Sequence, residues 1–386
     1  MLTIAVDSTP LTSQPSGIGL YTYNLINALK LLQTTENFQL GTVYQPRLKN
    51  WLRGKFITPD FINNLDIPVY RLPVPVTISN ILSKFPNPIL GYCERYLPPL
   101  DIVHGTDHVV YPCAKSLKIM TIHDLTFIKH PNFVNSIVKT YADRVKRCLK
   151  WTDLVITVSE SSKKDIVEYL KLPPEKVYVT HLASRYCPNY LSVSMMEKLA
   201  QELKYDFTKP YLLFVGTLEP RKNITNIISA FNWLKQKHKI EHQLVLIGKK
   251  GWNYQPILSA IEASPWQKEI HHLDYLPNEI VALFYSKAEV FIYPSHYEGF
   301  GLPVLEAMTL GVPVVTANTS SIPEVTGDAA ILINPNDYVQ LAESILKVIS
   351  DAHLRQLLIN QGKARANLFS WEKTAKETLK AYKSII

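Results

Sequence analysis

Short apolar runs rich in β-branched residues alternate along the chain with segments in which apolar residues recur every three or four positions. The runs predict buried strands and the periodic segments predict helices, a pattern typical of parallel βαβ units with helices on both faces of a sheet. In the first half this pattern predicts strands at residues 2–6, 101–104, 118–122 and 153–158 and a helix at 17–32. A further helix, capped by Ser159 or Ser161, is predicted to end near residue 171.

The alternation starts afresh near residue 211, which predicts a second doubly wound domain. Its predicted strands and helices lie at residues 211–215, 224–237, 243–247, 278–286, 290–292, 302–310 and 314–317. A chain of 386 residues also exceeds the size at which one hydrophobic core usually keeps growing. We therefore expect an N-terminal domain at residues 1–190 and a C-terminal domain at 205–368, with a cleft between them.

Three segments fall outside this alternation. Residues 51–99 are rich in proline and aromatic residues and predict an irregular excursion, which is either a packed loop or a surface that faces an acceptor or a membrane. The polar interval 188–209 contains no predicted strand and is expected to hold the linker. Residues 369–386 predict an amphipathic helix that crosses the domain boundary.

Composition narrows the class of partner. The chain is 46% hydrophobic and 19% charged, as is usual for a globular protein, and its formal net charge is +8. The basic residues are scattered, which counts against nucleic acid and favours a phosphorylated small substrate or a peripheral contact with an anionic membrane. The four cysteines lack metal-ligand spacing, so no metal site is expected. The cysteines also suggest no redox pair, so we expect a reduced, cytoplasmic protein. Because no apolar stretch is long enough to span a membrane, any membrane contact is expected to be peripheral.

The strongest candidate for chemistry is YPSHYEGFGLPVLEAM at residues 293–308. A predicted strand ends here in a glycine-flanked turn, and a helix with Pro303 near its first position follows directly. Such a helix N-terminus attracts phosphate through its unpaired N–H groups and its dipole. Glu306 can accept hydrogen bonds from vicinal ribose hydroxyls, and Glu298 can hold sugar hydroxyls. The stretch therefore predicts a site that binds three parts of a nucleotide sugar, namely its phosphate, its ribose and its sugar.

A second candidate is GTLEPRKN at residues 216–223, between a predicted strand and a helix. Arg221 and Lys222 are placed to neutralise a pyrophosphate at the carboxyl end of the strand, where open α/β sheets bind ligands. Each charge-assisted hydrogen bond contributes about 1.5–3 kcal/mol. The nucleotide base is expected near Gly248, Tyr275 and Leu276, which form no decisive pattern for one base.

Two weaker candidates lie in the N-terminal half. Gly17 and Gly19 resemble the start of a dinucleotide fingerprint, but Thr22 occupies the third glycine position, so no NAD site is expected. These glycines either approach the donor phosphates or only shape the start of a helix. His123 and Asp124 follow a predicted strand and can orient a donor sugar, with the carboxylate fixing the tautomer of the imidazole. The alternative for an isolated histidine is a purely structural role.

Together these motifs resemble family 4 of the retaining glycosyltransferases, whose GT-B fold has two Rossmann-like domains facing a central cleft. The similarity covers nearly the whole chain. It implies that the N-terminal domain, residues 1–190, binds the acceptor and that the C-terminal domain, residues 205–368, binds the nucleotide sugar. Its most specific part is the pair Glu298 and Glu306, with seven residues between them. The segments SSIPEV at 320–325 and GDAA at 327–330 resemble a branch with many bacterial mannosyltransferases of polysaccharide and lipid-linked glycan assembly.

The resemblance implies a role for each matching residue. Lys222 would bind the pyrophosphate, Glu306 the ribose, and His123 the sugar near the reacting carbon. Many relatives carry arginine where this chain has Thr217, and Arg221 is the cation available to compensate. The donor sugar and its phosphate would contact Glu298 and the backbone of Gly299, Phe300, Gly301 and Leu302.

The resemblance also implies the reaction: a retaining, metal-independent transfer of a hexose from a nucleotide sugar to a glycan or lipid-linked saccharide. Mannose from GDP-mannose is the first expectation for the donor, and UDP-linked hexoses come next. No cofactor beyond the donor substrate is expected. Two alternatives stay open, a nucleotide-sugar 2-epimerase with a GT-B-like fold and a non-catalytic subunit that binds a nucleotide sugar or a partner protein.

Overall fold

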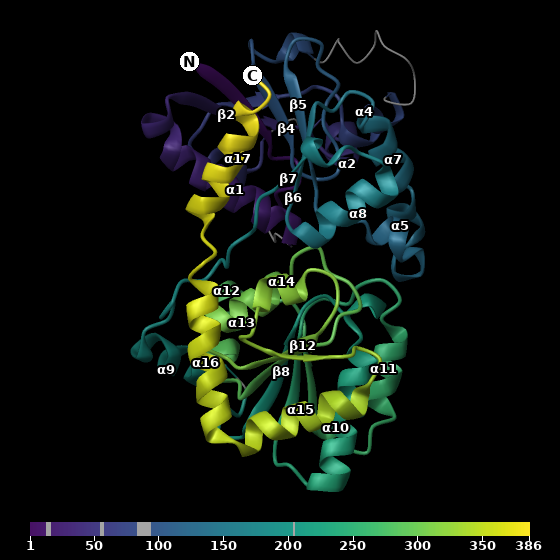
Figure 1. The fold of residues 1–386 in the computed structure, drawn as a ribbon, viewed down its shortest axis with the longest axis vertical. Helices are drawn as coiled ribbons and strands as arrows, with labels where there is room; N and C mark the ends of the chain where they lie inside the picture. Colours follow the sequence, from purple (N-terminus) through teal and green to yellow (C-terminus); the bar gives the residue numbers. More distant parts are fainter. Residues whose placement is uncertain (13–16, 55–57, 83–93, 204) are drawn as a thin grey trace. The chain divides into compact units, whose positions relative to one another are not determined.

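A computed structural model describes residues 1–12, 17–54, 58–82, 94–203 and 205–386. The chain divides into two compact units. Unit 1 comprises Met1–Pro131, Ser136–Leu182 and Ser370–Ile386, and unit 2 comprises Asn132–Asn135 and Ala183–Phe369. Each unit is built on its own parallel sheet covered by helices (Figure 1). This confirms the predicted α/β class with two doubly wound sheets.

Unit 1 has a sheet in the order β3-β2-β1-β4-β5-β6-β7, with every described neighbour pair parallel. Its strands are β1 (Leu2–Asp7), β2 (Phe38–Tyr44), β3 (Val69–Arg71), β4 (Ile102–Gly105), β5 (Leu117–Ile122), β6 (Leu154–Thr157) and β7 (Val177–Val179). Its helices are α1 (Gly17–Glu36), α2 (Leu48–Leu52), α3 (Asp60–Asn63), α4 (Val76–Leu82), α5 (Thr126–Lys129), α6 (Ser136–Lys139), α7 (Tyr141–Cys148), α8 (Glu160–Leu170) and α17 (Trp371–Lys383).

Unit 2 has a parallel sheet in the order β10-β9-β8-β11-β12-β13. Its strands are β8 (Tyr211–Val215), β9 (Gln243–Ile247), β10 (Ile270–Leu273), β11 (Val290–Tyr293), β12 (Val314–Ala317) and β13 (Ile331–Ile333). Its helices are α9 (Val193–Glu202), α10 (Ile224–His238), α11 (Gln255–Glu262), α12 (Asn278–Lys287), α13 (Leu302–Thr309), α14 (Ile322–Thr326), α15 (Tyr338–Ser350) and α16 (Ala352–Ala366).

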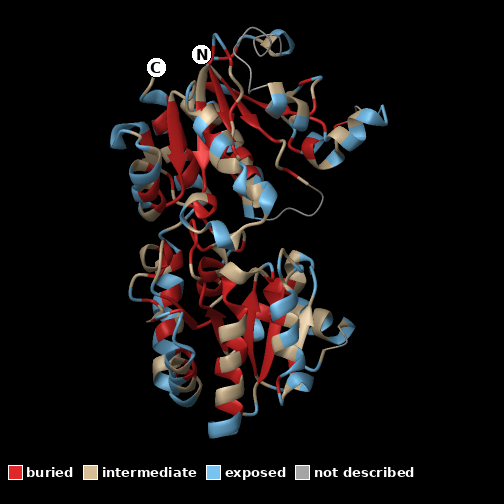
Figure 2. Cartoon of the chain, turned by 90° about the vertical axis from the view of Figure 1, so that its right-hand side faces the viewer, coloured by how far each residue is buried: buried red, intermediate tan, exposed pale blue. Residues whose placement is uncertain are grey.

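The central strands are buried on both faces, which explains their continuous apolar runs. All residues of β8, β9, β11 and β12 are buried, whereas outer helices such as α15 and α16 keep an exposed face (Figure 2). Ser159 caps α8, since its side chain accepts a hydrogen bond from the backbone N–H of Ser162. The predicted cap is thereby confirmed, with Ser159 in that role.

The structure revises the expectation for residues 51–99. The sequence predicts an irregular excursion, but the described part of this segment contains α3, β3 and α4, and β3 pairs with β2 at the edge of the sheet. A strand of three residues is too short to show a period in the sequence, which is why the pattern missed it. Residues 55–57 and 83–93 lie outside the described part of the chain.

The connection between the units also differs from the expected one. The interval 188–209, predicted to be a strandless linker, contains α9, and the chain passes from unit 1 to unit 2 at Leu182–Ala183. The C-terminal segment 369–386, predicted to cross the boundary, does so between Phe369 and Ser370, and its helix, α17, lies wholly in unit 1. There it packs beside α1, and Tyr382 hydrogen-bonds His104 of β4 at 2.6 Å. This buried hydrogen bond fixes the C-terminal helix against the sheet of unit 1.

Both sheets contain a point at which the strand order reverses. In unit 1 it lies between β1 and β4, and in unit 2 between β8 and β11. Loops that leave two such strands run to opposite faces of the sheet, so a crevice opens between them at the carboxyl edge. Candidate sites are therefore expected at these two places. Among the described residues, no helix combines the length and the apolarity needed to cross a membrane.

Candidate functional site

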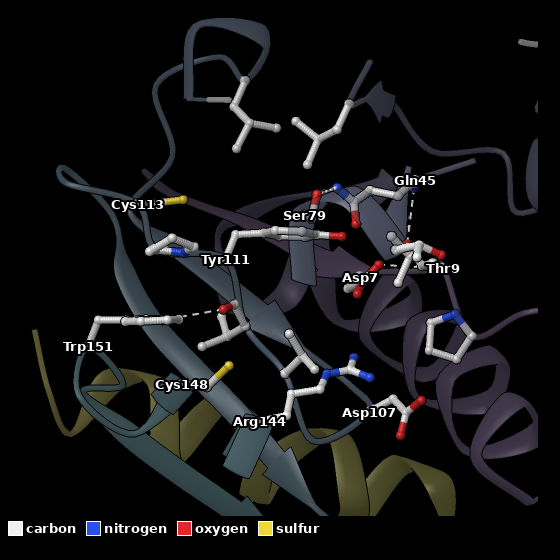
Figure 3. A pocket seen from close by; sticks show the side chains of 18 of the residues that line it. Asp7, Thr9, Gln45, Ser79, Asp107, Tyr111, Cys113, Arg144, Cys148 and Trp151 are labelled. Carbon is white, nitrogen blue, oxygen red and sulfur yellow. Dashed lines mark hydrogen bonds between the residues drawn. The ribbon is translucent and has the colours of Figure 1, made fainter. Parts of the chain in front are cut away.

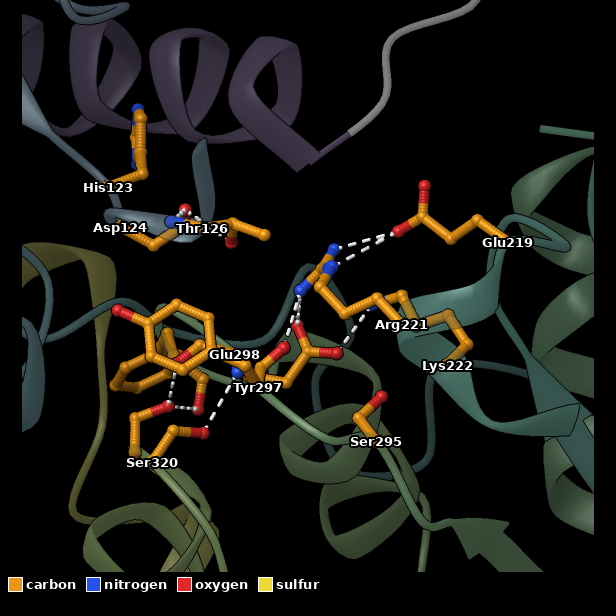
Figure 4. Close-up of polar contacts among 12 residues, drawn as sticks. His123, Asp124, Thr126, Glu219, Arg221, Lys222, Ser295, Tyr297, Glu298 and Ser320 are labelled. Carbon is orange, nitrogen blue, oxygen red and sulfur yellow. Dashed lines mark hydrogen bonds and ion pairs between the residues drawn. The ribbon is translucent and has the colours of Figure 1, made fainter. Parts of the chain in front are cut away.

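The two strongest sequence motifs meet at the reversal point of unit 2. Residues 216–223 leave the carboxyl end of β8, and residues 294–301 leave the carboxyl end of β11, the neighbouring strand. Arg221 and Lys222 from the first loop reach Glu298 in the second (Figure 4). Sheet topology thus brings together side chains that are more than 70 positions apart in the sequence.

Lys222 lies at the centre of this cluster and is only 7% exposed. Its Nζ donates to Oε1 of Glu298 and to the hydroxyl of Tyr293, both at 2.6 Å. Glu298 is also only 7% exposed. The sequence assigns Glu298 to sugar hydroxyls, but here its carboxylate is paired with two cations.

Arg221 connects the two loops through several contacts. It donates to Oε1 of Glu219, to the carbonyl of Tyr297 at 2.7 Å and to Oε2 of Glu298 at 2.9 Å. These contacts hold the guanidinium in one orientation and fix the loop after β11 against the loop after β8 (Figure 4).

The cluster shifts the ionisation of its members. Burial acts to raise the pKa of Glu298, but the positive charges of Arg221 and Lys222 outweigh it and lower that pKa to about 2. Burial, together with the nearby charge of Arg221, lowers the pKa of Lys222 against the pull of Glu298. The carboxylate therefore stays ionised at any pH near neutrality, and the site carries closely balanced charges.

The loop after β11 is shaped for the helix start that follows it. Gly301 precedes α13 with φ +107°, and a Cβ at this position would lie 2.6 Å from Cδ1 of Ile322, so only glycine fits. Ser320 accepts a hydrogen bond from the backbone N–H of Glu298, and Ser321 donates to the carbonyls of Glu298 and Phe300. Gly299, Phe300 and Gly301 are buried, while Leu302 is partly exposed.

Glu306, in α13, has a partner that sequence reasoning missed. Arg185 pairs with both carboxylate oxygens, with Nε 2.8 Å from Oε1 and Nη2 3.0 Å from Oε2. The same guanidinium donates to Oδ1 of Asn278 at 2.9 Å. Glu306 is only 2% exposed, so this arginine compensates an otherwise buried charge. No motif marks Arg185, because the contact spans 121 positions and depends on the fold of unit 2.

The residues proposed to contact a nucleotide base lie on the neighbouring loops. Gly248 follows β9 with φ +149°. A Cβ there would lie 2.0 Å from the carbonyl oxygen of Gly216, so the backbone of the loop after β9 is in direct contact with the backbone of the loop after β8. Thr217 is exposed in the first of these loops. Tyr275 follows β10 and is 38% exposed, with Nζ of Lys249 4.5 Å from its ring centre. Leu276, next to it, is partly buried.

The histidine candidate belongs to unit 1, at the end of β5. Nε2 of His123 donates to the carbonyl of Thr106 at 2.8 Å, so this carbonyl fixes the tautomer that the sequence assigned to Asp124. Oδ1 of Asp124 instead accepts hydrogen bonds from the backbone N–H and the hydroxyl of Thr126, at the start of α5. Burial lowers the pKa of His123, so the ring is neutral at pH 7.

The two early glycines lie inside a helix rather than in a loop. Gly17 is the first residue of α1 and is exposed, and Gly19 is buried within its first turn. A Cβ on Gly17 would meet nothing within 4 Å. Ser16, the first residue of that motif, lies outside the described part of the chain.

Comparison with known proteins connects this geometry to a family. A family model described as glycosyl transferases group 1 matches residues 195–365, and one described as glycosyltransferase family 4 matches residues 45–183. O-antigen chain mannosyltransferase B of Escherichia coli is 34% identical over 387 residues, which cover 97% of each chain.

Solved structures show the same fold. The chain superposes on a sucrose-phosphate synthase from Thermosynechococcus elongatus with a TM-score of 0.73 and 20% identity, over 100% of this chain and 99% of that one. The Anabaena protein Alr3699/HepE, solved in complex with UDP and glucose, gives a TM-score of 0.73 and 17% identity over the whole of both chains. The chain has the GT-B fold and belongs to family 4 of the glycosyltransferases.

Proposed function

We propose that this glycosyltransferase moves mannose from GDP-mannose to a glycan or lipid-linked saccharide, with retention of configuration and without a metal ion. The observation that carries the proposal is the buried cluster of Lys222, Arg221 and Glu298 at the reversal point of unit 2. The Escherichia coli relative, whose name gives mannose and the O-antigen chain, supports the sugar and the class of acceptor.

Lys222 is the cation proposed to meet the donor diphosphate. An ammonium group has three N–H donors, and Glu298 and Tyr293 take two of them among the residues that the structure describes. The third donor is available to a phosphate oxygen at the carboxyl edge of β8. Arg221 already donates hydrogen bonds to Glu219, Tyr297 and Glu298. We therefore assign it a structural role, in which it fixes the loop after β11.

Glu306 is proposed to bind the ribose while it stays paired with Arg185. A carboxylate has about four lone-pair positions. Nη2 of Arg185 takes one on Oε2 by a hydrogen bond, and Nε lies 2.8 Å from Oε1 as an ion pair. The remaining positions suit two vicinal hydroxyls. The guanidinium fixes the orientation of the carboxylate, so the ribose meets a preorganised acceptor.

Transfer then depends on stabilising the departing diphosphate. Negative charge grows on this group as the bond to the sugar breaks, and the ammonium of Lys222 and the N-terminus of α13 offset that charge. We propose that a phosphate oxygen takes the proton of the acceptor hydroxyl, so the enzyme needs no nucleophile of its own. The neutral ring of His123 is the proposed contact for the transferred sugar.

A thermal-shift screen tests the donor site. We expect GDP and GDP-mannose to raise the Tm of the full chain in the presence of EDTA, because a ligand that binds only the folded state stabilises it. At a concentration of 100 Kd the stabilisation is about 2.7 kcal/mol. UDP and ADP serve as matched controls, and NMR of the product reads the anomeric configuration.

Each outcome of this screen is informative. A shift with UDP but not GDP would overturn GDP-mannose and keep a nucleotide-sugar transferase. A shift that requires a divalent ion would overturn metal independence. Absence of any shift across the panel would contradict the donor site and favour a non-catalytic subunit.

A further inference from the structure

Four buried polar side chains of unit 1 form a continuous hydrogen-bonded network. The hydroxyl of Tyr382, in α17, lies 2.6 Å from Nδ1 of His104, in β4. Nε2 of His104 lies 2.7 Å from the hydroxyl of Thr121, in β5, which in turn lies 3.0 Å from the hydroxyl of Tyr21, in α1. All four residues have an exposed fraction of 0%. We refer to Tyr382, His104, Thr121 and Tyr21 as the buried network.

The buried network reaches His123, the proposed contact for the transferred sugar. The rings of Tyr21 and His123 meet edge to face, with their centres 4.9 Å apart. Thr121 precedes His123 by two positions, and residues two apart on a strand share a face, so Tyr21 contacts both. His104 likewise precedes Thr106 by two positions, and the carbonyl of Thr106 accepts the hydrogen bond from His123. The network therefore lies beside both points that hold the ring of His123.

His104 links the two halves of the network through its tautomer. Burial lowers the pKa of His104 to about 3, and charge on His123 acts in the same direction, so the ring of His104 is neutral near pH 7. A neutral imidazole has one N–H donor and one acceptor nitrogen. If Nδ1 accepts from Tyr382, Nε2 donates to Thr121, whose own proton is then available to Tyr21. Tyr382 therefore influences the hydrogen bond between Thr121 and Tyr21 through the tautomer of His104.

The buried network is separate from the cavity of unit 1. This cavity of about 290 Å³ opens at the carboxyl edge of the sheet, and its wall includes Asp7, Arg144 and Trp151 (Figure 3). Its described wall contains none of the four network residues and does not include His123. Substitutions in the network therefore change no side chain of the cavity wall.

We propose that Tyr382 is a positioning residue for glycosyl transfer, which acts through His104, Thr121 and Tyr21 to hold the ring of His123. The inference rests on the proposed function of His123, and it gives the C-terminal helix a role in the reaction. Loss of the Tyr382 hydroxyl leaves a nitrogen of His104 buried and unpaired. Because such a group is costly, the network rearranges and the contact between Tyr21 and His123 changes with it.

NMR of the full chain with ¹⁵N-labelled histidine tests this without any substrate. Long-range proton–nitrogen correlation spectra report the tautomer of each ring, and His104→Gln and His123→Ala assign the signals. In the wild type we expect a neutral His123 with its proton on Nε2. Tyr382→Phe, which keeps the ring in the core, should shift the signals of His123 as well as those of His104. Unchanged His123 signals would overturn the proposal.

Thr374 provides a matched control on the same helix. It is buried in α17, and its hydroxyl donates to the carbonyl of His181 at 2.6 Å, so it also fixes the helix to unit 1. It is not part of the buried network. Thr374→Val should therefore leave the ring signals of His123 unchanged. Equal shifts in Thr374→Val and Tyr382→Phe would show that loosening of the helix is sufficient, which would contradict a specific role for Tyr382.

A double-mutant cycle tests whether the effect reaches the reaction. Tyr382→Phe should lower kcat about 2–30-fold, the range of coupling through packed side chains, while the Kd of GDP stays unchanged. In a His123→Ala background the same substitution should cause no further loss of kcat, because the residue that it positions is absent. A purely structural role would give the same loss in both backgrounds, and that result would refute the proposal.

Tyr21 supplies a second pair of variants at the other end of the network. Tyr21→Phe keeps the ring against His123, whereas Tyr21→Leu removes the edge-to-face contact. We expect the leucine variant to lose more kcat than the phenylalanine variant, and equal losses would contradict positioning of His123 by this ring.

The outcomes separate this proposal from the proposed function. Full activity of His123→Ala would refute the sugar contact and with it the kinetic role of Tyr382. Reduced activity of His123→Ala, together with unchanged His123 signals in Tyr382→Phe, would refute the positioning role alone.

Discussion

Replacement of Lys222 by alanine is expected to lower kcat/KM about 10²–10³-fold, the usual cost of removing one preorganised donor from developing negative charge. Lys222 is the buried cation with a donor left for a phosphate oxygen at the carboxyl edge of β8. The loss should appear mainly in kcat, because the charge on the diphosphate grows as the sugar departs. Steady-state kinetics with GDP-mannose and a mannose-terminated acceptor measure it.

Lys235 provides a matched control for this variant. It is equally buried, at 7% exposure, and it is ion-paired with Glu269 in the same unit. It lies near the C-terminal end of α10, which follows the motif that contains Lys222. Lys235→Ala should therefore destabilise unit 2 without a specific loss of turnover. Equal kinetics for the two variants at equal Tm would exclude Lys222 from the reaction.

Replacement of Glu306 by glutamine should weaken GDP binding about 10–100-fold, since hydrogen bonds to a charged acceptor contribute about 1.5–3 kcal/mol. The substitution keeps the shape of the side chain and removes the charge that pairs with Arg185. Calorimetry with GDP and 2′-deoxy-GDP gives the decisive comparison. Wild-type protein should prefer GDP, and the variant should lose most of that preference, because the two changes remove the same contact.

Glu289→Gln is the control for this experiment. Glu289 is also paired with an arginine, Arg355, but it lies just before β11, at the amino edge of the sheet. It should leave the affinity for GDP unchanged. If Glu306→Gln still discriminates GDP from 2′-deoxy-GDP as strongly as the wild type, Glu306 does not bind the ribose.

Much of the local structure could be predicted from the sequence. The predicted strands 211–215, 243–247 and 314–317 coincide with β8, β9 and β12, since strands buried on both faces appear as unbroken apolar runs. Ser159 was recognisable as a cap because capping depends on only three consecutive residues beyond it. The motifs around Lys222 and Glu298 could also be recognised in the sequence, because each motif lies within a single loop that follows a single strand.

What only the tertiary structure decided is which loops meet. The pairing of β8 with β11 brings Lys222 and Arg221 onto Glu298, so the carboxylate expected to hold a sugar carries two ion pairs. Arg185 reaches Glu306 across 121 positions, and the cavity of unit 1 gathers residues from Asp7 to Trp151. Local propensity and periodicity act over a few residues, whereas strand order is set by burial of whole sheet faces. The sequence alone therefore determined the elements and their motifs, and the packing of the sheets determined the partners of the charged side chains.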